Sequence, residues 1–113
     1  MLMNIVDWEY TDNIAWSQRM GYVQTNYQHL VNVLGEPQWT DDEKTTAKWA
    51  VLATIQDEAG EEEDVLFTIY DWKMPRTPMG DYQWHIGGRG RRAVELAEWF
   101  LAHDRAVIKL RRG

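Results

Sequence analysis

Two residues with complementary chemistry, Asp71 and His85, stand near the ends of two predicted strands that are expected to be neighbours in a sheet. A carboxylate beside an imidazole is an arrangement that general acid–base catalysis uses. Neither strand segment contains a serine or cysteine nucleophile that would complete a catalytic triad. The alternative is a structural hydrogen bond or no contact at all, and we therefore expect a protein that is not an enzyme.

A second constellation follows His85, where a predicted strand runs through a glycine turn into a predicted helix: Gly87-Gly88-Arg89-Gly90-Arg91-Arg92. Backbone N–H groups at the start of a helix attract anions, and arginines strengthen that attraction. The candidate anion-binding residues are Gly87, Gly88, Arg89 and Arg91, with a nucleotide or another phosphate-bearing molecule as ligand. The segment lacks the Lys-Ser/Thr pair of a P-loop and the spacing of a dinucleotide fingerprint. The alternative is a turn whose arginines are solvated.

No pattern predicts a metal or a cofactor. The histidines His29, His85 and His103 share no metal-binding spacing, and the chain has no cysteine. The absence of cysteine is typical of a reducing compartment, so we expect the cytoplasm. The longest apolar run, Trp49 to Ile55, is too short to span a membrane, and the N-terminus does not resemble a signal peptide.

The net charge of −6 is unevenly distributed. Residues 1–64 carry 13 acids and 3 bases, whereas residues 65–113 carry 5 acids and 9 bases. This acidity disfavours a long nucleic acid as partner. The acidic run from Asp57 to Asp64 is either a mimic of nucleic acid phosphates or a solvated hairpin loop. The basic end, Lys109 to Arg112, either contacts nucleic acid or protects a last strand from aggregation.

The pattern predicts one domain over residues 1–113. In residues 1–23 we expect a short strand from Asn4 to Trp8 and either a helical turn or a short helix from Asp12 to Met20, before a break at Gly21. The apolar spacing predicts a helix from Thr25 to Leu34, capped by Thr25 and stopped by Gly35.

Alternating apolar residues predict a hairpin of two strands, Ala47 to Gln56 and Val65 to Trp72. A third strand, Asp81 to Ile86, is expected to end at Gly87-Gly88. A helix from Gly90 to Ala102 and a possible last strand from Ala106 to Leu110 complete the chain. The predicted fold class is α+β, with a three- to four-stranded antiparallel sheet and two helices packed on one face.

The other face of this sheet is unusually apolar, because it is expected to carry Leu52, Leu66, Thr68, Tyr70 and Trp72. Three covers are possible: residues 1–23, a second copy in a homodimer, or a partner. Seven tryptophans and five tyrosines are also too many for complete burial in a domain of this size. Tyr70, Trp72 and Trp84 could alternatively stack on the bases of a short nucleotide.

Three motifs carry a resemblance: Thr68-Ile69-Tyr70-Asp71-Trp72-Lys73, Trp84-His85-Ile86-Gly87-Gly88 and Leu34-Gly35-Glu36-Pro37. With these motifs, the chain from about Asn26 to Leu101 resembles small uncharacterised proteins of bacteriophages, especially those of actinobacteria. The resemblance implies a phage accessory context and no catalytic residues.

We therefore expect a phage-encoded, non-enzymatic protein that engages or inhibits a host protein in the host cytoplasm. An anti-defence (anti-CRISPR-like) or host-takeover role is the class-level expectation. The expected contact residues are Tyr70, Trp72, Trp84, Arg89, Arg91 and Arg92. The alternative is a small-ligand protein that captures a nucleotide at Gly87 to Arg92.

Overall fold

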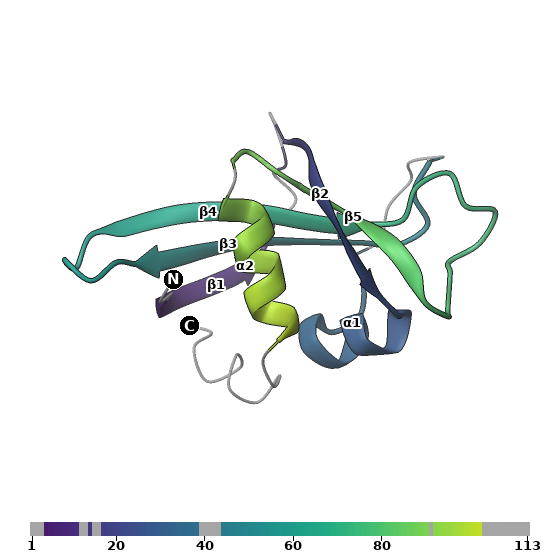
Figure 1. Cartoon of the computed structure of the whole chain (residues 1–113), viewed down its shortest axis with the longest axis horizontal. Helices are drawn as coiled ribbons and strands as arrows, with labels where there is room; N and C mark the ends of the chain where they lie inside the picture. The colour runs from purple at the N-terminus through teal and green to yellow at the C-terminus, as the bar shows by residue number, and fades with distance from the viewer. Residues whose placement is uncertain (1–3, 12–13, 15–16, 39–43, 91, 103–113) are drawn as a thin grey trace.

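The computed structural model describes residues 4–11, 14, 17–38, 44–90 and 92–102 of the chain. Along the chain, the elements are β1 (Asn4–Tyr10), β2 (Gln18–Thr25), α1 (Tyr27–Leu34), β3 (Lys48–Gln56), β4 (Glu62–Tyr70), β5 (Tyr82–Gly88) and α2 (Arg92–Leu101). The strands form one antiparallel sheet in the order β1-β3-β4-β5-β2 (Figure 1). The predicted α+β class is confirmed, with five strands instead of three or four.

The predicted hairpin is the centre of this sheet. Its register places Trp49 opposite Ile69 and Val51 opposite Phe67, and all four side chains are buried. Alternate positions on each strand therefore face the helices, as the period of two requires. Strand β4 begins at Glu62, because the second half of the predicted acidic loop continues the pairing with β3.

The N-terminal segment differs most from the prediction. Strand β2 begins at Gln18, so the expected helical turn from Asp12 to Met20 is wrong for its last three residues; residues 12–13 and 15–16 lie outside the described part. Gly21 does not break the chain but lies in β2, beside a shift in the register with β5. Strands β1 and β2 extend the sheet at its two edges and do not themselves cover its open face.

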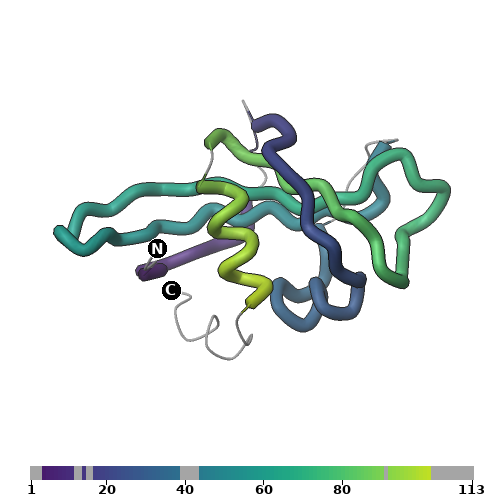
Figure 2. Tube along the Cα trace, in the orientation of Figure 1, coloured from purple at the N-terminus to yellow at the C-terminus, as the bar shows by residue number. Residues whose placement is uncertain are grey.

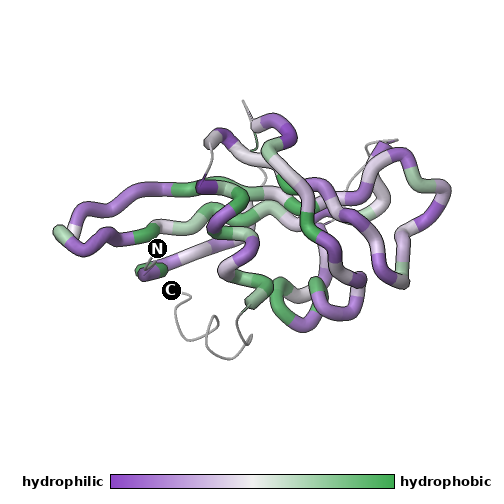
Figure 3. Tube along the Cα trace, viewed as in Figure 1, coloured by the Kyte–Doolittle hydropathy of each residue, from purple (hydrophilic) through white to green (hydrophobic). Residues whose placement is uncertain are grey.

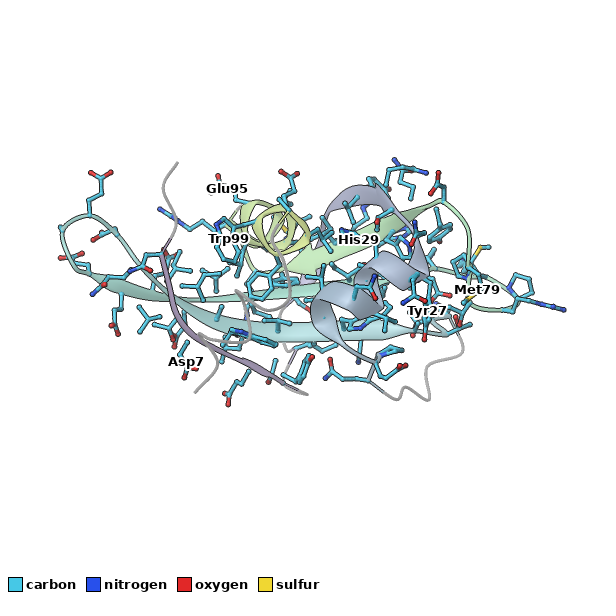
Figure 4. The ribbon with its side chains drawn as sticks, turned by 90° about the horizontal axis from the view of Figure 1, so that it is seen from below. Asp7, Tyr27, His29, Met79, Glu95 and Trp99 are labelled. Atoms are coloured by element: carbon cyan, nitrogen blue, oxygen red, sulfur yellow. The ribbon has the colours of Figure 1, made fainter. Side chains whose placement is uncertain are left out.

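Both helices lie on one face of the sheet, as predicted (Figure 4). The cap of α1 is Asn26 rather than Thr25, because the Asn26 side chain accepts a hydrogen bond from the His29 N–H at 2.9 Å. The His29 ring, labelled in Figure 4, also lies 2.9 Å from the Leu101 carbonyl oxygen and so links α1 to the end of α2.

The core between sheet and helices is strongly aromatic. Trp49, Phe67, Trp84 and Phe100 are fully buried, and neighbouring rings lie edge-on or tilted at 5.3 to 5.6 Å. Trp84 is therefore a core residue and does not belong among the partner contacts expected from the sequence. The predicted strand from Ala106 to Leu110 lies outside the described residues.

The molecule is elongated, with extents of 46 × 29 × 23 Å. The turn between β3 and β4 lies at one end, and the loop between β4 and β5 lies at the other (Figure 2). The β3–β4 turn is strongly hydrophilic, as the colouring in Figure 3 shows. There the exposed Asp57 carboxylate accepts the N–H groups of Ala59 and Glu61, both at 2.9 Å.

Candidate functional site: an aromatic and cationic patch on the open sheet face

Aromatic side chains from three adjacent strands meet on the open face, which is the face opposite the helices. Tyr70 of β4 pairs with His85 of β5, and His85 pairs with Tyr22 of β2. Residues opposite one another on neighbouring strands point to the same face, so these three form one row across the sheet. Trp72, just beyond the end of β4, joins them. We call Tyr22, Tyr70, Trp72 and His85 the aromatic patch.

The rings of the aromatic patch pack against one another. Tyr70 and His85 are stacked, with ring centres 5.3 Å apart and planes at 24°, and Tyr22 approaches His85 at 5.0 Å and 61°. Trp72 lies 6.2 Å from Tyr70 and 6.1 Å from His85. Tyr22 and Trp72 are 40% and 38% exposed, so the two outer members of the row present their rings to solvent.

Positive charges surround this patch. The Arg19 guanidinium lies 5.1 Å from the Tyr22 ring centre and donates to its hydroxyl at 2.6 Å. The ammonium groups of Lys44 and Lys73 lie 5.6 and 5.9 Å from the Trp72 ring centre. All three are cation–π contacts, which orient the cations beside the rings.

The segment that carries Trp72 is held by its backbone and by Asp71. The Trp72 N–H donates to the Tyr82 hydroxyl at 3.1 Å, and the Lys73 N–H donates to the Lys44 carbonyl at 2.7 Å. Lys73 has φ of 55°, in the left-handed region that side-chain-bearing residues seldom adopt. Such a conformation persists only where its surroundings impose it. The backbone around Trp72 is therefore held in one conformation by its contacts.

Asp71 is completely buried and serves as the anchor of this segment. Its carboxylate accepts the Thr46 N–H at 2.7 Å, the Ala47 N–H at 3.2 Å and the Thr46 hydroxyl. Both carboxylate oxygens thus bond to the two residues that precede β3. These bonds give Asp71 the structural role that was the alternative in the sequence prediction.

The titration of the patch follows from its packing. Burial lowers the pKa of His85 below its ordinary value, and the Arg19 guanidinium lowers it further, whereas the Asp71 carboxylate acts in the opposite direction. Burial raises the pKa of Tyr70 despite the opposing effect of Arg19. At neutral pH both rings are therefore uncharged, and the positive charge of the site comes from Arg19, Lys44 and Lys73.

We expect the His85 imidazole to titrate below about 6.5, the value of a free histidine, when followed by NMR. Because the folded-state pKa is lowered, the contribution of His85 to stability is complete above the unfolded pKa and is lost as the pH falls through the folded pKa. Arg19→Gln should raise the midpoint of the His85 titration. The midpoint should stay below the value of a free histidine, because burial is the larger cause of the lowered pKa. Arg76→Gln, in the exposed β4–β5 loop, is the control; an unchanged midpoint in Arg19→Gln would contradict this account.

The predicted anion site has a different geometry from the one expected. Gly87 and Gly88 do not end the strand but belong to β5, so the expected break is wrong. A Cβ on Gly87 would collide with the Thr68 hydroxyl, and one on Gly88 would lie 2.8 Å from the Leu66 carbonyl oxygen and collide with Ala93. The two glycines therefore permit close packing on both faces of the sheet. They do not form the glycine loop that the anion-binding hypothesis requires.

The three arginines of that segment have separate surroundings. Arg89 is exposed, and Arg92, the first residue of α2, pairs with Glu63 at 3.2 Å. Arg91 lies outside the described residues. Of the predicted contacts, Tyr70 and Trp72 thus meet in one site, whereas Arg89 and Arg92 lie by the far half of β4.

The sequence prediction missed four members of this site: Arg19, Tyr22, Lys44 and Lys73. Tyr22 and Arg19 come from β2, which the sequence did not reveal, and the two lysines come from loops. Within the described part of the chain, no group of three histidine, aspartate or glutamate side chains is placed to hold a metal ion. No helix in that part is long and apolar enough to cross a membrane.

The fold and the patch together define a small α+β protein whose antiparallel sheet presents aromatic rings and cations on its open face. No protein-family model, no curated protein and no solved structure matches the chain. The function must therefore be argued from the site itself, since a fold alone does not specify one.

Proposed function

We propose that this chain is a non-enzymatic binding protein that engages an acidic surface of a host protein through the aromatic patch. The observation that carries the proposal is the exposure of Tyr22 and Trp72 beside three oriented cations. Tryptophan, tyrosine and arginine are the residues that most often dominate binding energies at protein interfaces.

Two features favour an acidic protein over a nucleic acid. The rings of Tyr70 and His85 stack on each other, and cations lie over the rings of Tyr22 and Trp72, so most ring faces are already in contact. Bases bind aromatic side chains through those faces. The ring edges and the N–H groups of Arg19 and Lys73 face the remaining surface, and both kinds of group attract carboxylates. The net charge of −6 also opposes a long polyanion.

The biological setting rests on the resemblance to phage proteins. A phage accessory protein would meet its partner in the host cytoplasm, and the absence of cysteine fits a reducing compartment. Inhibition of a host defence protein, or takeover of a host protein, is the role that we propose for this encounter.

The test is recovery of a partner from an actinobacterial host lysate by tagged wild-type protein, followed by affinity measurement with the purified partner. Tyr22→Ala and Trp72→Ala should each weaken binding by about 30-fold or more, the effect of losing a hot-spot side chain of about 2 kcal/mol. Met79→Ala is the matched control, because Met79 is 63% exposed but lies outside the aromatic patch, in the β4–β5 loop (Figure 4).

Raising the salt concentration should also weaken wild-type binding more than binding by a Lys44→Gln/Lys73→Gln variant. A partner that binds Trp72→Ala and wild type equally would refute the assignment of the patch. Recovery of nuclease-sensitive nucleic acid in place of a protein would refute the partner class and favour base stacking.

A further inference from the structure

The outer edge of β4 is only half paired. Strand β5 pairs with Phe67, Thr68, Ile69 and Tyr70 of β4 and ends at Gly88. The preceding half of β4, residues 62–66, pairs with β3 on its inner side. In the part of the chain that the structure describes, no strand pairs with the outer side of that half.

The backbone of this half-strand presents its hydrogen-bonding groups outward. The Leu66 carbonyl oxygen points toward β5, since it lies 2.8 Å from the Cβ position of Gly88. In an antiparallel ladder, alternate residues direct both N–H and C=O to the same side. The N–H and C=O groups of Asp64 and Glu62 therefore also point away from β3 and lack strand partners.

A groove of about 520 Å³ runs beside this edge. One wall is β4 itself, at Glu63, Asp64 and Leu66, and the other is the start of α2 with Arg89 and Ala93. Arg92 ties the walls together through its ion pair with Glu63. An unpaired strand edge with a groove alongside it is the arrangement in which an extended peptide adds a strand to a sheet.

The side chains along this edge specify what can add. Glu62 and Asp64 lie on the open face, and residues directly opposite one another in a sheet interact through their charges. Pairing of two β4 edges from two copies would bring these acids together, which disfavours a second copy. On the helix side, an added strand would pass Glu63, which is already paired with Arg92, and then Val65 beside Ala93. This favours an apolar residue opposite Val65.

We infer that the groove at residues 62–66 receives an extended segment of a partner protein in which basic and apolar residues alternate. The segment continues the sheet beyond the end of β5 and places its basic side chains opposite Glu62 and Asp64. This surface is separate from the aromatic patch, so the inference does not depend on the function proposed above.

The experiment uses a synthetic peptide, acetyl-Thr-Lys-Val-Lys-Val-Lys-Thr-amide, and hydrogen exchange of the 113-residue chain followed by NMR. At ten times its dissociation constant, the peptide should slow exchange of the Glu62 and Asp64 amides by about tenfold. The same peptide with N-methylated backbone amides on the pairing side should give no protection, and neither should an analogue with glutamate in place of lysine.

Matched variants separate charge from backbone pairing. Glu62→Gln/Asp64→Asn should weaken binding at least tenfold, whereas Glu58→Gln/Glu61→Gln removes the same charge from the nearby turn and should have little effect. Trp72→Ala should leave peptide binding unchanged. If the N-methylated peptide bound as tightly as the lysine peptide, the attraction would be electrostatic without strand pairing. If the lysine peptide left exchange of the Glu62 and Asp64 amides unchanged, the acids would serve only to protect the edge from pairing. Either result overturns the inference.

Discussion

Replacing Asp71 with alanine should lower the free energy of unfolding by about 3 kcal/mol. The buried carboxylate is the acceptor for two backbone N–H groups and one hydroxyl. Without it, the buried Ala47 N–H and the partly buried Thr46 donors lose their acceptor. A buried donor left without a partner costs about 1–3 kcal/mol, and the partly buried ones cost less because water reaches them. Removing the charge from the interior offsets part of that loss. Urea denaturation should show a lower midpoint at an unchanged slope.

Asp57 supplies the control for this prediction. Its carboxylate also accepts two backbone N–H groups, at Ala59 and Glu61, but it is exposed, so water can replace it. Asp57→Ala should therefore cost no more than about 1 kcal/mol. Equal losses in the two variants would show that burial does not set the importance of Asp71. Asp71→Ala should also weaken partner binding, because the anchor positions Trp72.

Replacing Gly88 with alanine should destabilise the fold by about 3 kcal/mol, the upper range for an overpacked core. The new methyl group would collide with Ala93 and lie 2.8 Å from the Leu66 carbonyl oxygen. Both obstacles are fixed, since Leu66 belongs to a central strand and Ala93 is buried in the first turn of α2. The helix would have to move away from the sheet, and thermal unfolding would report the loss.

Gly90→Ala is the matched substitution, because nothing lies within 4 Å of the added Cβ. It should change stability by no more than about 0.5 kcal/mol. If Gly88→Ala were as stable as Gly90→Ala, the packing explanation for the glycine pair would be wrong. A phosphate-binding role for the pair would then regain support.

The sequence predicted those elements whose pattern is set by burial. Strands β3 and β4 are rich in apolar residues because they lie at the centre of the sheet and are largely buried, and α1 shows an apolar stripe because one of its sides is buried. Strand β2 was missed because it is an edge strand without a buried residue and has Gly21 in its middle. Its pairing with β5 is a long-range contact that no local pattern encodes.

The site was only partly predictable for the same reason. Tyr70 and Trp72 were found because a strand pattern placed them on the open face. Trp84 was assigned to that face wrongly, since its position in β5 directs it into the core beside Trp49. Tyr22 joins the patch only through its register with His85, which depends on how the whole sheet is assembled.

The strand order also determines when the N-terminal quarter of the chain can fold. Strands β1 and β2 are consecutive in sequence, yet β1 pairs with β3 and β2 with β5, at opposite edges of the sheet. During synthesis, β1 has no strand to pair with until β3 has been made, and β2 has none until β5 has been made. Both strands can therefore join the sheet only as the β3–β4–β5 meander forms. Tyr22, one of the two most exposed members of the aromatic patch, is therefore placed late. Contacts of such long sequence separation make folding slow relative to the size of the chain.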